Sequence, residues 1–228
     1  MVSWNCDGLV NKIPDLCSLI CKHDIVTLVE TWSEDNEQCS LLSQLTGYVY
    51  EELNAVRLSK HGRASGGIIT FFKKSMKPYI TRIDKTFQFA VIVKVARSAL
   101  CLEHDVILVC CYIPPEGSKR YLQTNESNGI ELLKEKLMEL KSEYNESKII
   151  ISGDLNARIG TEQDFILDDN VNFAMNMEWY TVDQFDKIRT SRDKTVNAFG
   201  KSLVDLCCEL DLHVLNGRCK GDEQGDLT

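Results

Sequence analysis

The sequence predicts an α+β protein, a four-layered α/β sandwich with two packed, mainly antiparallel sheets flanked by helices. Short runs rich in β-branched and aromatic residues recur between residues 48 and 112, separated by Gly, Pro or charged turns. Segments with apolar residues at helical spacing lie on either side of that region. With 228 residues, 43% of them hydrophobic, the chain can bury a sizeable core, and we expect one domain over residues 1–228.

The first part of the chain predicts alternating strands and helices. Residues 1–4 form a short apolar strand, and Asn11 can cap a helix with Ile13, Leu16 and Ile20 on its apolar face. Residues 24–29 predict a second, buried strand, and residues 39–45 a brief helix.

The middle and end of the chain continue the pattern. Strands are predicted over residues 48–52, 66–72, 77–83, 87–95 and 105–112. A long helix follows, capped by Thr124 or Asn125 and running to Tyr144. Three consecutive isoleucines at 149–151 predict a strand buried on both faces and ended by Gly153. We read residues 161–195 as a surface excursion, 197–210 as a helix and 213–215 as the start of a strand. The sequence stops within what resembles a turn, so we expect the last strands of the sandwich to be missing.

The charge of the chain narrows the function classes. A net charge of -8 and a pI near 5.1 argue against strong non-specific nucleic-acid binding, which depends on neutralising phosphates. An acidic metal site acting on a phosphodiester is still compatible with this charge. One span is locally basic, and its cations are either a phosphate-binding strip or solvated side chains at strand ends. These cations are Arg57, Lys60, Arg63, Lys73, Lys74 and Lys77.

The cysteines and the apolar runs predict a reduced, intracellular protein, nuclear or cytoplasmic. Most of the ten cysteines sit inside apolar patterns, where thiols act as small hydrophobes. They are Cys6, Cys17, Cys21, Cys110, Cys111, Cys207 and Cys208. No CxxC pair occurs, which argues against a zinc site. No export signal and no apolar run long enough to span a bilayer are present, so no membrane partner is expected.

Polar residues directly follow four of the predicted strands. They are Asn5 and Asp7, Glu30, Tyr112, and Asp154 with Asn156. On an extended backbone, residues two apart point to the same side, so a carboxylate and a carboxamide at 154 and 156 could hold and deprotonate a water. The alternative is an Asp/Asn-rich turn after a strand, which is common.

Two further strand ends suggest metal and phosphate binding. Mg²⁺ takes few carboxylates and keeps several waters, so Glu30 with Asn5 or Asp7 would suffice as an open site. The alternative is an exposed glutamate at a strand end. Tyr112 precedes Ile-Pro-Pro and either presents its hydroxyl to a phosphate oxygen or packs on the prolines. The four histidines suit surface or cap positions better than a catalytic base.

The segments that carry these residues resemble a known superfamily. Ser-Trp-Asn-Cys-Asp-Gly-Leu at 3–9, Leu-Val-Glu-Thr-Trp at 28–32, Cys-Tyr-Ile-Pro-Pro at 111–115 and Ser-Gly-Asp-Leu-Asn-Ala-Arg at 152–158 occur in sequence order. This order and rough spacing resemble the endonuclease/exonuclease/phosphatase superfamily. With residues 189–193, 197–200 and 214–218, the chain is most similar to the apurinic-type endonuclease domain of non-LTR (LINE-type) retrotransposons.

The resemblance implies a Mg²⁺-dependent phosphodiesterase that nicks DNA, with Mn²⁺ as an alternative metal and a reverse transcriptase as partner in a full-length parent. By position, Asn5 and Glu30 match metal-site residues, and Asp7 matches less well. Tyr112 matches the tyrosine that contacts the scissile phosphate. Asp154 matches the residue that activates the attacking water, and Asn156 the residue that orients it. Asn5, Tyr112 and Asn156 are therefore the expected substrate-binding residues.

One departure from the superfamily concerns its last motif. Its site is completed by a further Asp and by a C-terminal Ser-Asp-His, and no Ser-Asp-His occurs in these 228 residues. We therefore expect a truncated copy whose nicking is weakened or lost. The alternatives are a catalytically inactive remnant, or a phosphatase-type protein acting on a small phosphorylated substrate or lipid. The retrotransposon-like segments argue against the last.

Overall fold

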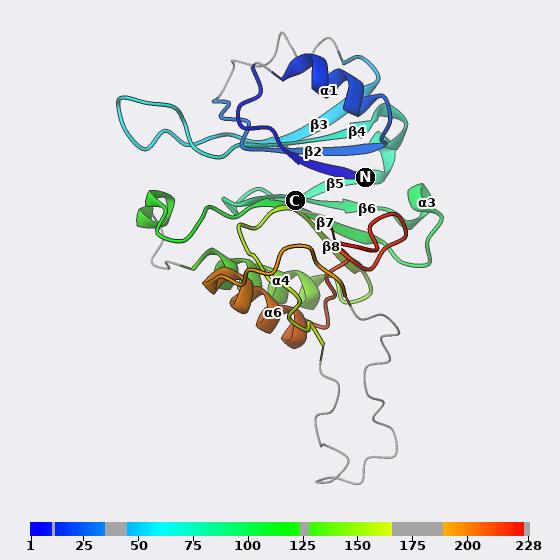
Figure 1. Ribbon diagram of the computed structural model, residues 1–228. Helices are drawn as coiled ribbons and strands as arrows, with labels where there is room; N and C mark the ends of the chain where they lie inside the picture. Colours follow the sequence, from blue (N-terminus) through cyan, green and yellow to red (C-terminus); the bar gives the residue numbers. More distant parts are fainter. Residues whose placement is uncertain (11, 35–44, 124–127, 166–188, 226–228) are drawn as a thin grey trace, which may run out of the picture. The chain divides into compact units, whose positions relative to one another are not determined.

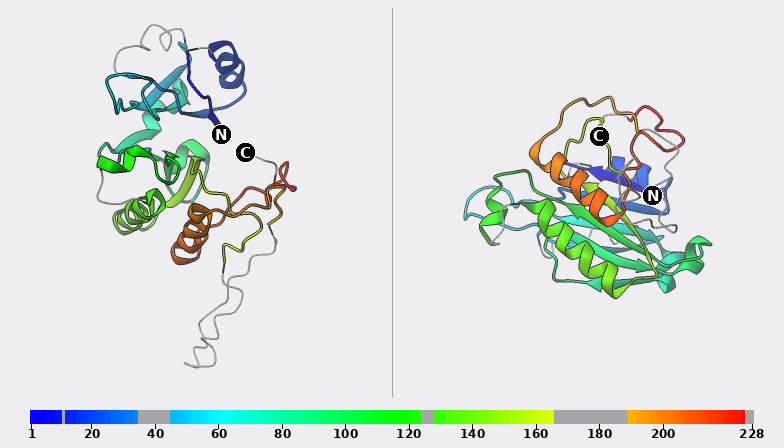
Figure 2. Two further views of the ribbon diagram at one scale, coloured as in Figure 1. Left: turned by 60° about the vertical axis from the view of Figure 1, so that its left-hand side comes forward. Right: turned by 90° about the horizontal axis from the view of Figure 1, so that it is seen from below.

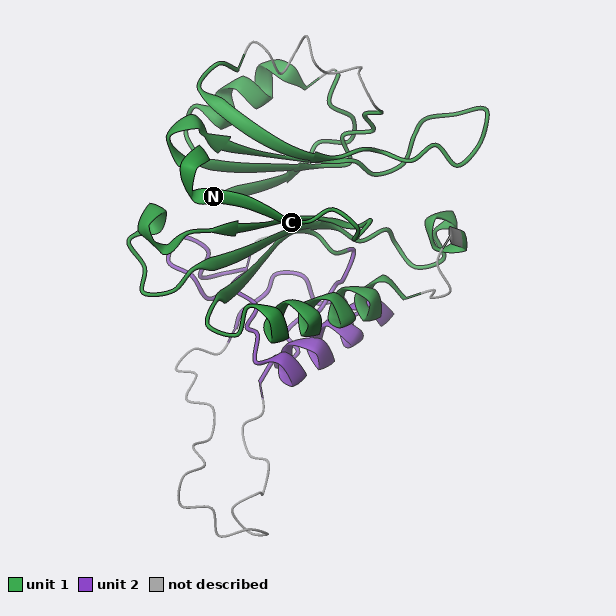
Figure 3. Ribbon diagram, turned by 180° about the vertical axis from the view of Figure 1, so that it is seen from behind, with its two compact units in different colours: residues 1–155 green, residues 156–228 purple. Residues whose placement is uncertain are grey.

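The computed structural model describes residues 1–10, 12–34, 45–123, 128–165 and 189–225 (Figure 1). The chain divides into two compact units, Met1–Leu155 and Asn156–Thr228, coloured separately in Figure 3. That the whole chain is one domain stays a prediction. Asn11, Thr124, Asn125, residues 166–188 of the excursion and nearly all of the helix expected at 39–45 lie outside the described residues.

The first sheet of unit 1 is built from four strands in the order β1-β2-β4-β3. They are β1 (Val2–Asn5), β2 (Ile25–Val29), β3 (Tyr48–Leu53) and β4 (Ile68–Lys73). β1 runs parallel to β2, and the other two pairs are antiparallel. Helix α1 (Ile13–Ile20) covers one face, where Leu16 and Ile20 are buried against Leu28 and Phe71.

The second sheet has the order β5-β6-β7-β8. Its strands are β5 (Ile80–Asp84), β6 (Ala90–Val95), β7 (Val106–Tyr112) and β8 (Lys148–Asp154). Only β7 and β8 are parallel in it. Helix α4 (Gly129–Glu143) covers its outer face (Figures 1 and 2). Short elements η1 (Lys74–Tyr79), α3 (Arg97–Leu100) and η2 (Lys119–Gln123) complete the described part of this unit.

The core of unit 1 lies between the two sheets. Val29 and Phe72 of the first sheet pack with Val93 and Leu108 of the second, and all four are buried. Such alternation of inward apolar side chains is what holds sheets face to face. The predicted α+β sandwich with mainly antiparallel sheets flanked by helices is therefore confirmed, with one parallel pair in each sheet.

Unit 2 contains helix α6 (Ala198–Leu210), close to its predicted bounds. Asn197 caps it, because its Oδ1 accepts a hydrogen bond from the Gly200 backbone N–H at 2.7 Å. Phe199, Leu206 and Leu210 are buried on one side of the helix.

Three predicted strands begin elsewhere or do not form. The strand expected at 77–83 starts only at Ile80, because residues 74–79, with Pro78, form a 3-10 helix. The strand expected at 87–95 starts at Ala90, since the Asp84 carboxylate accepts from the Thr86 and Phe87 backbone N–H groups and turns the chain. Residues 213–215 form no strand, because the Val214 N–H donates instead to the Asp164 carboxylate at 2.6 Å.

Caps, strand ends and burial also differ from prediction. Asn128 caps α4, with its Oδ1 accepting from Ile130 N–H at 2.9 Å, in place of Thr124 or Asn125. β8 continues through Gly153 to Asp154, and its isoleucines are only half-buried because β8 is the last strand of its sheet in the described residues. Cys17 and Cys21 are exposed and do not join the core, because the buried residues of α1 are Leu16 and Ile20. Among the described residues, no helix combines the length and apolar character that crossing a membrane requires.

Candidate functional site

Four predicted side chains meet at the strand ends of unit 1. These are Asn5, Glu30, Tyr112 and Asp154, here called the strand-end quartet. The Asn5 amide Nδ2 donates to Glu30 Oε1 at 3.0 Å and to Asp154 Oδ2 at 2.9 Å. One carboxamide therefore joins two carboxylates that are 124 positions apart in sequence, one from each sheet.

Strand register explains how the quartet assembles. Asn5 lies opposite Val29 in the parallel pair β1–β2, so Glu30 follows one residue beyond it. Tyr112 lies opposite Asp154 in the parallel pair β7–β8. Parallel neighbours in register point to the same face, so Tyr112 and Asp154 lie side by side. Strands β2 and β7, which are buried along their whole length, hold Glu30 and Tyr112 in place.

The backbone around the quartet adopts conformations that L-residues avoid. Asp7, Glu30 and Trp32 have φ values of +46°, +54° and +55°. Such residues cost about 1–3 kcal/mol each and persist where surrounding structure enforces them, often at functional sites. Here the Gly8 N–H donates to the Glu30 carbonyl at 2.8 Å, and the Trp32 N–H donates to the Gly66 carbonyl at 2.9 Å. The loop carrying Glu30 is therefore fixed on both sides.

The indole of Trp32 is stacked between a glycine and an arginine. A Cβ on Gly8 would lie 2.6 Å from Trp32 Cε3, so only glycine leaves room for the ring. On the ring, the Arg63 guanidinium carbon lies 3.7 Å from the ring centroid. The sequence pattern indicates Arg63 only as part of a basic strip and gives no role for Trp32, because their contact spans 31 positions.

Burial and charge fix the protonation of two groups at the site. Burial raises the pKa of the Tyr112 hydroxyl, and the charge of Glu30, its hydrogen bond to that hydroxyl and the charge of Asp154 raise it further. The hydroxyl therefore stays protonated at neutral pH and acts as a donor. Burial likewise raises the pKa of the neighbouring Cys6 thiol to about 11, which excludes it as a thiolate nucleophile near pH 7.

The quartet has the donor set of a hard cation. Glu30 and Asp154 supply carboxylate oxygens and Asn5 a carboxamide, which suits Mg²⁺ with several waters. Among the described residues, no group of three His, Cys, Asp or Glu side chains forms a metal cage. A protein-only cage is therefore absent from that part, whereas an open, water-rich site fits. The Asp7 backbone N–H donates to Asn5 Oδ1 at 3.2 Å, but its carboxylate pairs with Arg63.

Asn156 belongs to unit 2 and departs from the geometry expected of it. Its φ is +49°, so the extended backbone that would align its side chain with that of Asp154 ends before it. Asn tolerates this left-handed conformation. Its carbonyl accepts from Asn197 Nδ2 at 2.9 Å, which holds the backbone of Asn156 to the cap of α6.

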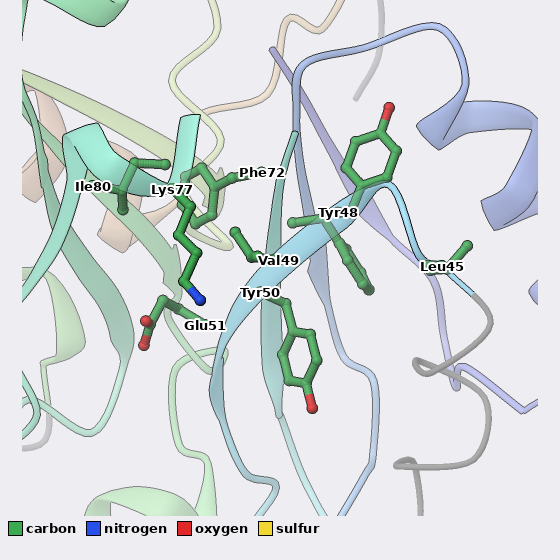
Figure 4. Close-up of a pocket in the computed structure, with 9 residues that line it drawn as sticks. Leu45, Tyr48, Val49, Tyr50, Glu51, Phe72, Lys77 and Ile80 are labelled. Atoms are coloured by element: carbon green, nitrogen blue, oxygen red, sulfur yellow. The ribbon is translucent and has the colours of Figure 1, made fainter. Parts of the chain in front are cut away.

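One further feature of unit 1 lies apart from the quartet. A pocket of about 430 Å³ lies along β3, and no quartet residue lines it (Figure 4). Its walls include Tyr48, Tyr50 and Phe72.

The structure also splits the predicted basic strip. Residues 57–63 precede β4, while Lys73, Lys74 and Lys77 lie at or beyond its other end.

Of three comparisons with known proteins, the one with solved structures found matches. No protein-family profile and no curated protein sequence matches the chain. Among solved structures, an AP endonuclease from Leishmania major matches with a TM-score of 0.51 at 17% identity, covering 69% of this chain and 55% of that one. The catalytic domain of Xenopus laevis APE2 matches with a TM-score of 0.48 at 18% identity, covering 75% and 63%. A 3'-5' exonuclease (NExo) from Neisseria meningitidis gives 0.45 at 15% identity, covering 69% and 58%.

In each case the chain spans less than two thirds of the protein it matches. At 17% identity and a TM-score of 0.51, the Leishmania match shows a shared fold alone. The two mixed four-stranded sheets and their helices have the fold of AP endonucleases.

Proposed function

We propose that the chain is a metal-dependent phosphodiester hydrolase that nicks DNA and derives from a retrotransposon. The observation that carries this proposal is the Asn5 amide, which holds Glu30 and Asp154 together at the ends of two sheets. Residues held in sparsely populated backbone conformations, such as Glu30, cluster at functional sites. A site for a cation and a water is the simplest reason for this arrangement.

Each quartet member has a distinct role in the proposed reaction. Glu30 holds the metal, Mg²⁺ or Mn²⁺, with Asn5 and Asp7 beside it. When bound, the metal supplies positive charge for the phosphate and the leaving oxygen. Asp154 accepts a proton from the attacking water, and Asn5 fixes the direction of that carboxylate through the 2.9 Å hydrogen bond.

Tyr112 and Asn156 complete the proposal. The raised pKa of Tyr112 keeps its hydroxyl a donor, as contact with a non-bridging phosphate oxygen requires. Asn156 orients the water, a role that rests on its position two residues after Asp154 and on the resemblance.

DNA as substrate rests on the resemblance and on the Leishmania neighbour, which is named an AP endonuclease. The chain covers 55% of that protein, so its substrate is a proposal for this chain. A reverse transcriptase joined to the same polypeptide is the proposed partner. A nuclear or cytoplasmic location is also proposed, on the ground that most cysteines sit inside apolar sequence patterns.

The test is nicking of supercoiled plasmid with Mg²⁺, comparing the chain, Asp154→Asn and a sample with EDTA. We expect Asp154→Asn to lower the nicking rate about 10²–10⁴-fold, since a general base contributes about that much. The matched control is Asp24→Asn, which removes a carboxylate that pairs with Lys73. Equal nicking by Asp154→Asn and the control would contradict the proposal.

A second candidate function is DNA binding without hydrolysis, by an inactive remnant. It is favoured by the backbone of Asn156, whose φ of +49° departs from the extended geometry expected of a residue that orients the water. A folded chain that binds duplex DNA but does not nick it with Mg²⁺ or Mn²⁺ would establish this candidate. Hydrolysis of a small phosphomonoester without nicking would instead indicate a phosphatase.

A further inference from the structure

A basic hairpin joins β3 to β4 in unit 1. It spans residues 54–67 and is closed by the antiparallel bridge between Val56 and Ser65. Its tip, residues 57–63, reads Arg-Leu-Ser-Lys-His-Gly-Arg, with three formal positive charges and no acid, in a chain of net charge -8. Arg57, Lys60 and Arg63 are all exposed. Figure 1 shows this segment, in cyan, extending well beyond the strands it connects.

The base of this basic hairpin is fixed to the loop that carries Glu30. Thr31 N–H donates to the Gly67 carbonyl at 3.3 Å, and Ala55 N–H donates to the Ser33 carbonyl at 2.8 Å. The hairpin base is also attached to η2, because the buried Arg120 donates from its Nη1 to the Ser65 carbonyl at 2.8 Å. The hairpin and the quartet therefore keep a fixed relation within unit 1.

The glycines of the hairpin base make this close approach possible. Gly66 and Gly67 have φ values of +77° and +89°. A Cβ on Gly67 would lie 2.4 Å from Thr31 Oγ1, and one on Gly66 would lie 2.6 Å from Arg120 Nη1. Glycine at 67 therefore lets the hairpin lie directly against the Glu30 loop, and glycine at 66 leaves room for the Arg120 guanidinium.

Arg63 extends the positive charge of the hairpin to the rim of the quartet. Its guanidinium stacks on Trp32 and lies 3.8 Å from Asp7 Oδ1, while its side chain is 64% exposed. An exposed pair at this distance is weak. A phosphate can therefore replace Asp7 as the partner of Arg63 while the guanidinium stays on the indole.

We propose that the basic hairpin binds the phosphate backbone of a DNA strand whose neighbouring phosphodiester lies in the quartet. This inference rests on the proposed function and names the surface that holds its substrate. The Arg63 fork suits phosphate oxygens, and Lys60 at the tip adds a second charge farther along the strand. Arg57 instead maintains the hairpin, because it pairs with Glu34 and its Nη1 donates to the Gly62 carbonyl at 2.6 Å.

The chain supplies a matched control for this surface. Lys74 and Lys77 are also exposed, and they lie in η1, beyond the other end of β4. Lys74→Gln/Lys77→Gln removes the same charge as Lys60→Gln/Arg63→Gln. Both pairs leave the Arg57–Glu34 and Lys73–Asp24 ion pairs unchanged. The two variants have the same net charge. A difference in their DNA binding therefore shows that the location of the removed charges matters.

The experiment measures binding of a fluorescent DNA duplex by anisotropy over a range of salt concentrations, in EDTA so that no strand is cleaved. We expect Lys60→Gln/Arg63→Gln to reduce the slope of log K against log salt by about 1–2, since each phosphate contact contributes about 0.9. We expect the control pair to change it by less than about 0.5. Thermal unfolding of both variants verifies that they fold.

Several outcomes would overturn the inference. They are equal slopes for the two variants, no measurable binding by the unsubstituted chain, and competition by polyglutamate equal to that by unlabelled DNA. Because binding is measured without metal, the proposed function is judged separately. Hairpin-dependent binding without nicking would support the inference and contradict hydrolysis. Nicking with the same KM in both variants would support hydrolysis and contradict the inference about the hairpin.

Discussion

The two units of the chain bury different kinds of side chain. Unit 1 encloses an apolar core between its sheets, and its described residues include two buried guanidinium side chains, those of Arg120 and Arg82. The described part of unit 2 is smaller, yet it buries Asp164, Arg189 and Arg218. Asp164 accepts from both Arg218 terminal nitrogens at 2.6 Å and from the Val214 N–H.

This difference shows how the charges of unit 1 are used. Its catalytic candidates are polar groups at the rim of an apolar sandwich, where they need not be neutralised to keep the core intact. In unit 2 the charges are part of the core, so removing one leaves its partner buried without compensation. Substituting rim charges should therefore change activity, whereas substituting the buried charges of unit 2 should change folding.

The largest expected effect on stability comes from Asp164→Asn. It leaves the buried Arg218 guanidinium without its carboxylate, and we expect unit 2 to lose about 3–5 kcal/mol. Amide hydrogen exchange should show loss of protection in α6, with the strands of unit 1 unchanged. The control is Asp193→Asn, whose partner Arg158 is exposed. Undiminished protection of α6 in Asp164→Asn would contradict the contrast between the units.

In unit 1 we expect stability to depend most on packing, so that adding one carbon atom at a closely packed glycine should destabilise it. Gly153 has φ +134°, and a Cβ there would lie 1.8 Å from the Cys111 carbonyl oxygen. We expect Gly153→Ala to destabilise unit 1 by about 2–3 kcal/mol in denaturant unfolding, because β8 must move away from β7. Gly62→Ala is the control, with φ +104° and open space around its Cβ position. Equal losses would mean that backbone strain alone, without the clash, accounts for the effect.

A smaller effect follows from pH. Burial alone would raise the pKa of Asp164, but hydrogen bonds from Arg218 and the Val214 N–H outweigh it and lower the pKa below its ordinary value. The stabilisation is therefore present above the unfolded pKa of about 3.9 and is lost as pH falls through the lower, folded value. Hydrogen exchange below about pH 4 should show α6 losing protection before β6 and β7.

Among the described residues of unit 1, Asp84 is a partly buried carboxylate with a lowered pKa, and it ends the edge strand β5. Burial opposes ionisation of Asp84, but the Phe87 N–H and Lys136 lower its pKa overall. Acid should therefore loosen the edge strand β5 while β6 and β7 stay protected. Loss of β6 and β7 protection before that of α6 would contradict the assignment of charge dependence to unit 2.

The parts of the fold that the sequence predicts are those that depend on local pattern. Apolar runs located β2, β4 and β7 to within two residues, and Asn197 was correctly placed at the start of α6. The errors arose where a distant or polar contact redirects the chain. Asp84 turns the chain before β6, and Asp164 takes the Val214 N–H that a strand would have used.

The candidate site was predictable to a similar extent. Polar residues after buried strands indicated Asn5, Glu30, Tyr112 and Asp154, because strand ends in a sandwich meet at one edge. The contributions of Trp32, Arg63 and Arg120 depend on contacts across 31 to 55 positions, which no local pattern records. Asn156 lies only two residues after Asp154, yet it belongs to the other compact unit. This division depends on how the chain packs, so the local sequence does not show it.

The central claim is that the strand-end quartet holds the metal that hydrolysis requires. The most direct measurement is the Mg²⁺ dependence of cleavage of a labelled duplex by Glu30→Gln, with the exposed Glu103→Gln as control. We predict that Glu30→Gln raises the Mg²⁺ concentration for half-maximal rate at least about tenfold, because a neutral amide replaces a carboxylate ligand. The control should match the unsubstituted chain. An unchanged rate and an unchanged Mg²⁺ dependence in Glu30→Gln would contradict the claim.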